Sequence, residues 1–390
     1  MVRRMFENKL LGGSVVVASH IYATGPALEL EEYLINKTKG LLFIGHPFAY
    51  RKNRNSFFRR YRRGKLIAEN ESWGNNLLPV MFYFRDAFLT FWWVLRAEEK
   101  VDIFIGSDNF LAFVGLLLKR VGKVKRVVLY TIDYVPRRFS NPILNYLYHF
   151  FDRRCMRECV AVWNVSKKIG EARKEERGIG GRGWAKQIVV PLGVWYERIR
   201  FLSFEKKRPY RLVFMGHLLE KQGLQIVIKA LPVVVKKIPK VELVVIGSGE
   251  YARELKKMVI KLGQERRVRF LGYIEDHKEV EKELSKAVVA LATYKPDPES
   301  FTYYADPGKI KNYLACGCTV LVTAVPPIAS ELAKRRCGLV VEYDEEAVAA
   351  GLISLLGNER KLSSYCQNAR QYAERFDWNK VFSEALAKTI

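Results

Sequence analysis

The sequence predicts an α/β protein built from two doubly wound domains in series. Short apolar runs bounded by Gly, Asp or Pro alternate with longer segments of helical period, which is the pattern of parallel strands joined by crossover helices. The chain has 390 residues, of which 49% are hydrophobic, enough for two cores. The pattern is interrupted once, so we expect a domain over residues 1–197, a linker over 198–209 and a second domain over 210–375.

Each half of the chain contains six apolar runs, which predict two sheets of about six strands. The first-half runs lie at 14–19, 41–45, 101–106, 126–131, 160–165 and 187–191. The second-half runs lie at 210–216, 241–247, 268–272, 287–293, 319–323 and 338–342. Because ligands of such domains bind at the carboxyl ends of the strands, we expect two Rossmann-like domains facing a central cleft, with functional residues just after strands.

The composition restricts the partners and the location of the protein. The formal net charge is +25, with the larger excess in the first half, which indicates a nucleic acid, an anionic membrane or a phosphorylated substrate as partner. The six cysteines lack zinc-finger spacing and predict reduced thiols without a metal site. From the charged residues 1–9 and the shortness of the apolar runs, we expect neither a secretory leader nor a segment that spans a bilayer. We expect a cytoplasmic protein or one held peripherally on the inner face of the membrane.

The first candidate site in the second half is FMGHLLEKQGLQIVIKAL, residues 214–231. A strand ends at Gly216, a loop presents His217 and Lys221, and Gly223 opens a helix. The free amides at the start of a helix favour an anion. In isolation, Lys221 is equally well explained as a solvated residue of a loop.

Three further segments follow in a defined order: VELVVIGSGEYARELK, VRFLGYIE and AVVALATYKPDPESFTYYADPGKIKNYLACGCTVLVT. Together with the first, they make residues 205–385 resemble the retaining glycosyltransferases of GT-B architecture, in particular group 4. The resemblance implies that Lys221 holds the diphosphate of a nucleotide sugar, with His217 where arginine is usual. It places Tyr273 and Ile274 beside the nucleotide base. It also implies that residues 376–390 form a helix that crosses back to the first domain.

The last of these segments departs from the pattern of the family. Asn312 stands where the second glutamate is usual, and Tyr304 occupies the position eight residues earlier. Asn312 keeps one carbonyl acceptor for a ribose hydroxyl but loses the charge. Glu299 and Asp306 are the carboxylates left in the loop, and the resemblance places Lys309 toward the diphosphate or the sugar. Alternatively, Asp306 caps the helix and Lys309 is a surface charge.

The first half supplies one further donor-binding candidate and the candidates for the acceptor side. Gly25, the donor-binding candidate, lies in a loop after a strand and lets the backbone approach a phosphate or sugar, and His20 lies close by. Asp133 follows the run at 126–131, where the family often places an acid–base or orienting residue. A carboxylate there can accept the hydroxyl proton of the acceptor or stabilise an oxocarbenium-like transition state. The alternative is that Asp133 pairs with Arg137 or Arg138.

Basic and aromatic residues are concentrated in RKNRNSFFRRYRRGK, residues 51–65, ahead of an apolar helical segment at 77–97. This combination suits an anionic membrane surface or single-stranded nucleic acid, and we favour the membrane. In the alternative reading, 77–97 is a buried core helix and the basic run is a solvated loop. The residues assigned to the membrane or acceptor are Arg51, Lys52, Arg59, Arg60, Arg62 and Arg63.

Together with the resemblance, these observations predict a glycosyltransferase that moves a sugar from a nucleotide-diphosphate sugar to a hydroxyl of a glycan or lipid-linked acceptor. The resemblance implies that it retains the anomeric configuration and needs no catalytic metal, and no cofactor is expected. Nucleic acid is not an expected partner. The alternatives are a catalytically inactive protein that binds sugar nucleotides, a GT-B-fold epimerase and, on charge alone, a nucleic-acid-binding protein.

Overall fold

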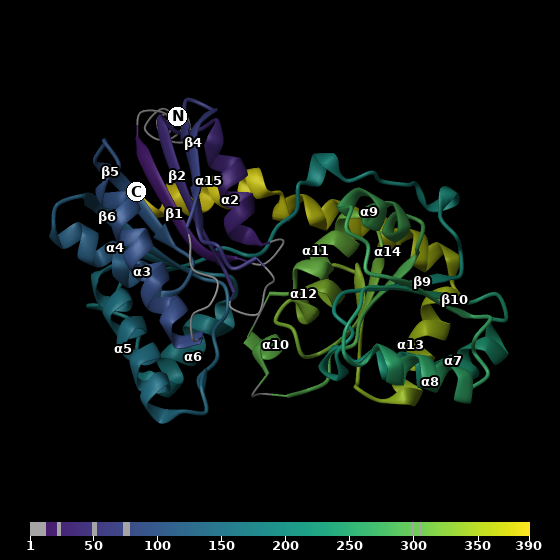
Figure 1. Cartoon of the computed structure of the whole chain (residues 1–390). Helices are drawn as coiled ribbons and strands as arrows, with labels where there is room; N and C mark the ends of the chain where they lie inside the picture. Colours follow the sequence, from purple (N-terminus) through teal and green to yellow (C-terminus); the bar gives the residue numbers. More distant parts are fainter. Residues whose placement is uncertain (1–12, 22–24, 49–52, 73–78, 298–299, 305) are drawn as a thin grey trace. The chain divides into compact units, whose positions relative to one another are not determined.

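The computed structural model describes residues 13–21, 25–48, 53–72, 79–297, 300–304 and 306–390 (Figure 1). The chain divides into two compact units, one formed by the residues up to Pro191 with Trp378–Ile390, and one by Leu192–Asp377. Each unit is an α/β domain with a largely or wholly parallel sheet. This confirms the predicted class of two Rossmann-like domains.

The first sheet has eight strands in the order β4-β3-β2-β1-β5-β6-β7-β8. All neighbours are parallel except β2–β3 and β3–β4, which form an antiparallel edge. The predicted six strands are present, and the additional pair at the edge is a difference from the prediction. The strands are β1 (Ser14–Ile21), β2 (Gly40–Pro47), β3 (Phe57–Arg62), β4 (Lys65–Glu71), β5 (Val101–Gly106), β6 (Val124–Thr131), β7 (Ala161–Asn164) and β8 (Lys186–Val189).

Helices cover both faces of the first sheet. One face packs against α3, α4 and α5, which lie side by side in Figure 1, while α2 packs against α15. The last helix is tied to the sheet because Trp163 Nε1 donates to Thr389 Oγ1 over 2.8 Å. The helices are α2 (Pro26–Ile35), α3 (Pro79–Leu95), α4 (Asn109–Arg120), α5 (Pro142–Glu158), α6 (Lys167–Arg177) and α15 (Trp378–Thr389).

The second sheet has the six predicted strands, all parallel, in the order β11-β10-β9-β12-β13-β14. The strand order reverses between β9 and β12, which is the point where doubly wound sheets bind ligands. The strands are β9 (Arg211–Met215), β10 (Glu242–Ile246), β11 (Val268–Gly272), β12 (Val289–Ala292), β13 (Thr319–Thr323) and β14 (Gly338–Val341).

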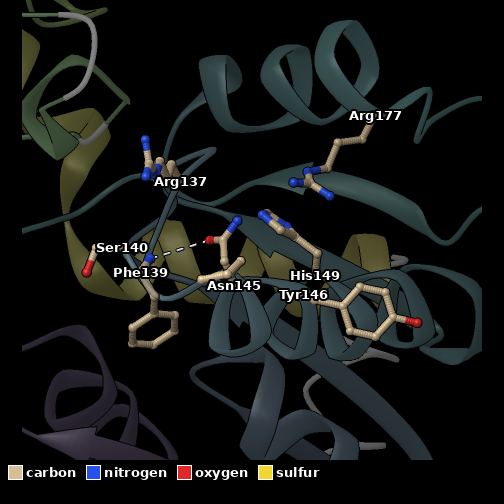
Figure 2. Close-up of a pocket in the computed structure, with 8 residues that line it drawn as sticks. Arg137, Phe139, Ser140, Asn145, Tyr146, His149 and Arg177 are labelled. Carbon is tan, nitrogen blue, oxygen red and sulfur yellow. Dashed lines mark hydrogen bonds between the residues drawn. The ribbon is translucent and has the colours of Figure 1, made fainter.

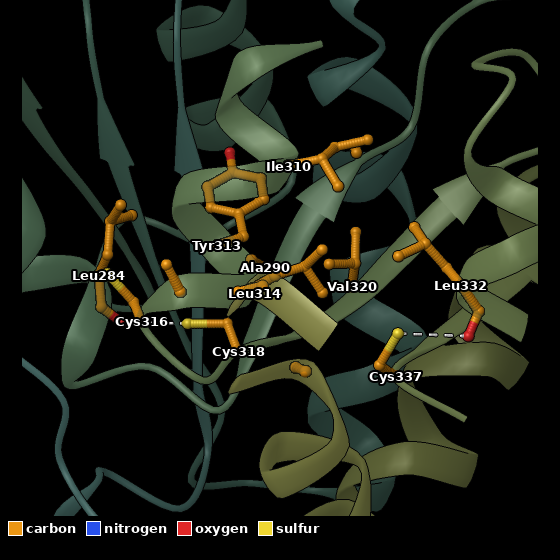
Figure 3. Packing of buried hydrophobic residues seen from close by; sticks show 14 of the residues in the cluster. Leu284, Ala290, Ile310, Tyr313, Leu314, Cys316, Cys318, Val320, Leu332 and Cys337 are labelled. Atoms are coloured by element: carbon orange, nitrogen blue, oxygen red, sulfur yellow. Dashed lines mark hydrogen bonds between the residues drawn. The ribbon is translucent and has the colours of Figure 1, made fainter. Parts of the chain in front are cut away.

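Two apolar cores flank this sheet, one beneath α7, α8 and α13 and one beneath α9, α11 and α12. Figure 3 shows the second core, where Tyr313 and Leu314 of α11 meet Val320 of β13. The helices are α7 (Leu224–Lys237), α8 (Ala252–Lys261), α9 (His277–Ser285), α10 (Phe301–Tyr304), α11 (Gly308–Ala315), α12 (Ala329–Lys334), α13 (Glu345–Leu356) and α14 (Glu359–Ala373). Short 3₁₀ turns occur at Tyr196–Arg198, Phe204–Lys206, Glu220–Gln222 and Glu374–Phe376.

Residues 198–209, predicted to be the linker, lie within the second unit. Lys207 anchors them, because its buried ammonium donates to the carbonyl oxygens of Ser285 and Cys316 at 2.8 Å and of Ala287 at 3.2 Å. A lysine satisfied by three carbonyls can be buried without a counter-ion nearby. The chain instead crosses between the units at Pro191–Leu192 and again at Asp377–Trp378.

All six cysteines are free and buried. In Figure 3 the Sγ of Cys318 points to the carbonyl of Leu284, 3.2 Å away, and burial raises the pKa of Cys318 to about 12. Among the described residues, no cluster of His, Cys, Asp and Glu side chains could hold a metal ion. A search of the same residues finds no helix with the length and apolarity needed to cross a membrane.

Candidate functional site

The loop between β9 and α7 is held against the end of β12. Gly223 has φ of +76°, and a Cβ on it would lie 1.5 Å from the carbonyl oxygen of Thr293. Thr293 Oγ1 in turn donates to Gly223 O over 2.9 Å, and Lys295 N donates to Lys221 O over 3.1 Å. Only glycine permits this approach. The loop that carries His217 and Lys221 therefore has a fixed position at the carboxyl edge of the sheet.

Lys309, in the first turn of α11, reaches this loop. Its Nζ lies 2.7 Å from Gln222 Oε1 and over the rings of Phe214, at 4.4 Å, and Tyr294, at 4.5 Å. Within the described part of the chain no carboxylate pairs with it, and burial lowers the pKa of Lys309 to about 7. Aromatic rings and one amide oxygen do not neutralise the charge of an ammonium, so Lys309 can still attract an anion.

Asn312 lies one turn further along α11. Its Nδ2 donates to Gly308 O over 3.3 Å, while its carbonyl oxygen has no partner among the described residues. The helix is fixed to the sheet because the hydroxyl of buried Tyr313 accepts from Met215 N over 2.8 Å. Lys309 and Asn312 are three residues apart and so share one side of the helix.

Asp306 has a structural role in this geometry. Its carboxylate forms an ion pair with fully buried Lys311 and accepts from Leu192 N over 2.9 Å. It does not cap α11, whose N-cap is Pro307. The ion pair leaves this carboxylate with little capacity to bind a donor. Glu299, the other carboxylate predicted for this loop, lies outside the described residues.

The remaining predicted donor residues differ in their exposure. His217 is exposed after β9, and Tyr273 is 67% exposed after β11. Ile274 is half-buried against the core below α9 and α11, and Lys221 is half-buried in the β9–α7 loop. The structure therefore places Lys309 against the loop that carries Lys221, through Gln222, with Asn312 on the same helix, while Tyr273 follows a strand two positions away from β9 in the sheet.

In the first unit, Gly25 and Asp133 line one cavity of about 540 Å³. Asp133 is exposed and forms no ion pair among the described residues, so the predicted alternative of a pair with Arg137 or Arg138 does not occur there. The walls are mainly apolar side chains from α3, α4 and α5. They include Tyr83, Phe84, Phe110, Phe139, Leu144, Leu147, Tyr148 and Phe151.

A buried charge cluster at the base of this cavity was not recognised from the sequence. His20 Nδ1 lies 2.6 Å from Asp108 and His20 Nε2 lies 3.4 Å from Asp86. Burial opposes protonation of His20, but the two carboxylates more than offset it and raise its pKa to about 9. Asp86 also lies 3.4 Å from His46. One feature of the sequence could have predicted this cluster: His20, His46 and Asp108 lie at the carboxyl ends of β1, β2 and β5, respectively.

The basic run forms the hairpin β3–β4 rather than a solvated loop. Arg59 Nη2 lies 2.6 Å from buried Glu31, Arg62 Nη2 lies 3.4 Å from Glu98, and Arg63 forms the turn with φ of +48°. Arg60 lies on β3 between them, with its Nε buried. The cations of Arg59 and Arg62 are thus used within the unit. Arg51 and Lys52 lie outside the described residues.

The segment predicted at 77–97 forms α3, which is buried on one side only. Phe82, Asp86, Thr90 and Val94 are buried. The opposite side carries an exposed apolar stripe, which comprises Met81, Phe84, Phe88, Trp92 and Leu95. A second exposed apolar group lies on α5 and comprises Ile143, Tyr146, Leu147 and Phe150. The expected alternative of a wholly buried helix is therefore wrong.

Part of the chain is similar in sequence to known proteins, and nearly the whole chain is similar in fold to solved structures. Residues 196–374 match the family of glycosyl transferases group 1. Over 177 residues the chain is 26% identical to the phosphatidyl-myo-inositol mannosyltransferase of Mycolicibacterium smegmatis, covering 45% of this chain and 43% of that protein. The chain thus spans less than half the length of that curated relative. The mannosyltransferase of Mycobacterium tuberculosis matches at 26% over 181 residues, 45% of each protein.

Solved structures match over nearly the whole chain. Anabaena HepE in complex with UDP gives a TM-score of 0.68 at 16% identity, covering 96% of this chain and all of that one. Sucrose-phosphate synthase from Thermosynechococcus elongatus gives 0.66 at 14%, covering 96% of both chains. The pneumococcal O-GlcNAc transferase GtfA in complex with UDP and GlcNAc gives 0.64 at 11%, covering 97% and 99%. At these identities the likeness concerns the fold.

The two units have the fold of the GT-B glycosyltransferases, and residues 196–374, a little less than half of the chain, match the family of glycosyl transferases group 1. That match lies in the second unit and agrees with the resemblance predicted from the sequence.

Proposed function

We propose that the protein transfers a glycosyl group from a nucleotide-diphosphate sugar to a hydroxyl of a lipid-linked acceptor. The observation that carries the proposal is Lys309, a cation at the switch point of the second sheet that no described carboxylate neutralises. A diphosphate bound beside it would supply the missing charge. The amide-rich starts of α7 and α11 and the ammonium of Lys221 would add to the stabilisation of that anion.

In this mechanism the charge that develops on the leaving diphosphate is met by fixed cations and helix dipoles, so no divalent metal is required. Asn312 would accept a hydrogen bond from the ribose through its free carbonyl oxygen. Asp133 would act at the acceptor as proton acceptor or as the group that stabilises an oxocarbenium-like transition state. Retention of the anomeric configuration is proposed from the family resemblance.

The lipid nature of the acceptor is supported by the first unit. The cavity that contains Asp133 is lined by apolar side chains, and two of them, Phe84 and Leu147, also belong to the exposed apolar groups of α3 and α5. An apolar chain could therefore pass from a membrane surface into the cavity. The two mycobacterial relatives are phosphatidyl-myo-inositol mannosyltransferases, which is consistent with a lipid acceptor. We place the protein on the cytoplasmic face of a membrane.

A sugar-nucleotide-binding protein without transferase activity is the second candidate, and it is favoured by Asn312 and exposed His217 in place of charged residues. A thermal-shift series with UDP-, GDP- and ADP-sugars, each with and without Mg²⁺, tests binding. We expect one donor to stabilise the protein independently of Mg²⁺. Lys309→Met should weaken that donor by about 10- to 100-fold, since a charged hydrogen bond contributes about 1.5–3 kcal/mol.

Lys334→Met is the matched control, because Lys334 is exposed at the end of α12. No stabilisation of the wild type by any sugar nucleotide would contradict the proposal. Transfer is measured separately, as release of the nucleoside diphosphate in the presence of a membrane lipid extract. Asp133→Asn should bind the donor normally and lose at least about 100-fold in turnover. Donor binding without any wild-type turnover would favour the second candidate.

A further inference from the structure

The loop between β6 and α5 forms, with α5 and α6, an open hollow of about 420 Å³ in the first unit. Figure 2 shows Arg137 and Arg177 on either side of Asn145 and His149, with the guanidinium of Arg177 directed toward the imidazole. Ser140 lies at the side of Arg137. None of the described residues that line it carries a carboxylate.

The polar groups that face this hollow are hydrogen-bond donors. Asn145 Oδ1 accepts from Arg138 N, at 2.9 Å, and from Phe139 N, at 3.4 Å, so the amide nitrogen is left for the hollow (Figure 2). Among the described residues neither Arg137 nor Arg177 has an ion pair. Arginine is the side chain best suited to hold a phosphate with two parallel hydrogen bonds.

His149 provides an independent observation. It is only 8% exposed, its Nε2 donates to Pro136 O over 2.8 Å, and its Nδ1 has no hydrogen-bond partner in the described part of the chain. Burial and the nearby charge of Arg177 lower the pKa of His149. A buried, unpaired imidazole nitrogen costs folding free energy unless another group satisfies it.

The charges around His149 leave a positive excess. Asp152, on the same helix, is the carboxylate that acts on it, but both of its oxygens are bound by Arg173, at 2.7 and 3.1 Å. Arg177 on α6 also interacts with the charge of exposed Glu176, but among the described residues neither Arg177 nor Arg137 on the loop forms an ion pair. Like charges gathered without a counter-ion destabilise a fold, which indicates that an anion completes the group.

We propose that this hollow binds a phosphate group carried by the acceptor, with Arg137 and Arg177 as its cations, Asn145 and Ser140 as additional donors, and His149 as a further donor once its Nδ1 is protonated. The proposal rests on the proposed function only in naming the acceptor. Phe139 lines both the hollow and the apolar cavity that contains Asp133. A phosphate held here would therefore place the adjoining part of a lipid headgroup beside that cavity.

The test measures binding of two probes, inorganic phosphate and monomeric dihexanoyl-phosphatidylglycerol, by calorimetry on the full chain. Arg137→Gln/Arg177→Gln should weaken the better probe by about 100-fold, at about 10-fold per arginine. Arg182→Gln, at an exposed arginine outside the hollow, is the control. Tighter binding of the lipid probe would identify a headgroup as the source, and tighter binding of inorganic phosphate a soluble phosphorylated acceptor. Equal affinities in the double variant and the control would overturn the proposal.

A second readout separates this role from a merely structural one. The phosphodiester keeps one negative charge between pH 6 and 8, so a change in its affinity reports on the protein. Binding raises the pKa of His149, so affinity should be highest below the pKa of the free form and fall as the pH rises through that of the complex. His149→Gln should remove this dependence. Stabilisation by sugar nucleotides should be unchanged in every variant, so failure here is distinguishable from failure of the donor site.

Discussion

Lys309 has a lowered pKa and lies at the carboxyl edge of the second sheet, where we propose that the sugar nucleotide binds. Binding of this donor should therefore depend on pH. In the free protein burial lowers the pKa of Lys309 to about 7. A bound diphosphate would raise that pKa again, because an adjacent anion favours the ammonium. The stabilisation is then fully present below about pH 7 and is lost as the pH rises through the pKa of the complex.

We therefore predict that the affinity for the preferred sugar nucleotide decreases by up to about tenfold per pH unit above pH 7. Calorimetric titrations between pH 6 and 9 measure this, and the diphosphate diester keeps its charge throughout that range. In Lys309→Arg the guanidinium remains protonated, so the profile should be flat. A wild-type profile as flat as that of Lys309→Arg would show that Lys309 does not meet the diphosphate.

At the scale of single residues, the sequence predicted positions better than roles. Lys309 and Asn312 were located on one helix because their spacing is local. Asp306, in contrast, resembled a helix cap or a donor ligand, yet it holds Lys311 and the backbone of Leu192, 114 residues away. Such partners are set by tertiary packing, and no local pattern reports them.

At the scale of elements, the polar segment at residues 198–209 is packed into the second unit and contributes to its stability. Lys207→Met removes an ammonium that satisfies three buried carbonyl oxygens. We predict a loss of about 3 kcal/mol in the free energy of unfolding, because each orphaned carbonyl costs about 1 kcal/mol or more. Calorimetry should show the melting transition of the second unit lowered by about 6–12 °C.

Lys206→Met is the comparison, since Lys206 is adjacent and exposed. It should change the same transition by no more than about 1–2 °C, because an exposed substitution costs at most about 0.5 kcal/mol. Equal effects of the two substitutions would mean that the anchoring of this segment does not depend on the lysine ammonium.

The burial of each strand decides whether it could be predicted from the sequence. The four inner strands of the second sheet, β9, β10, β12 and β13, are buried on both faces along nearly their whole length and read as continuous apolar runs. β3 and β4 form an antiparallel extension of the sheet, in which Arg59, Arg60 and Arg62 are mixed with aromatic residues on β3 and the edge strand β4 is mostly exposed. Polar and charged residues are typical of such an exposed edge, which is why this part of the chain lacks the continuous apolar pattern of a buried strand. The pairing of Arg59 with Glu31 could not be predicted, because it is set by tertiary packing, as are the partners of Asp306.

At the scale of the whole molecule, the net charge of +25 and the exposed apolar groups of α3 and α5 both bear on whether the protein binds a membrane surface. Charge alone would attract any polyanion, but it would not select a lipid surface. On α3, Phe84 is 69% exposed and Phe88 63% exposed, and Trp92 lies under the guanidinium of Arg96 at 4.0 Å. Aromatic side chains flanked by a cation suit the interface of an anionic membrane.

We predict that Phe84→Ser/Phe88→Ser/Trp92→Ser abolishes binding to vesicles that contain an anionic lipid. Inserting three such side chains contributes about 3 kcal/mol or more, so the partition coefficient should fall by at least about 100-fold. Flotation on a density gradient measures it. Val233→Ser/Ile260→Ser, which removes exposed apolar residues from the second unit, should float as the wild type does. If the triple variant floats equally well at low salt and detaches at high salt, the attraction is electrostatic alone and the apolar stripe of α3 has another partner.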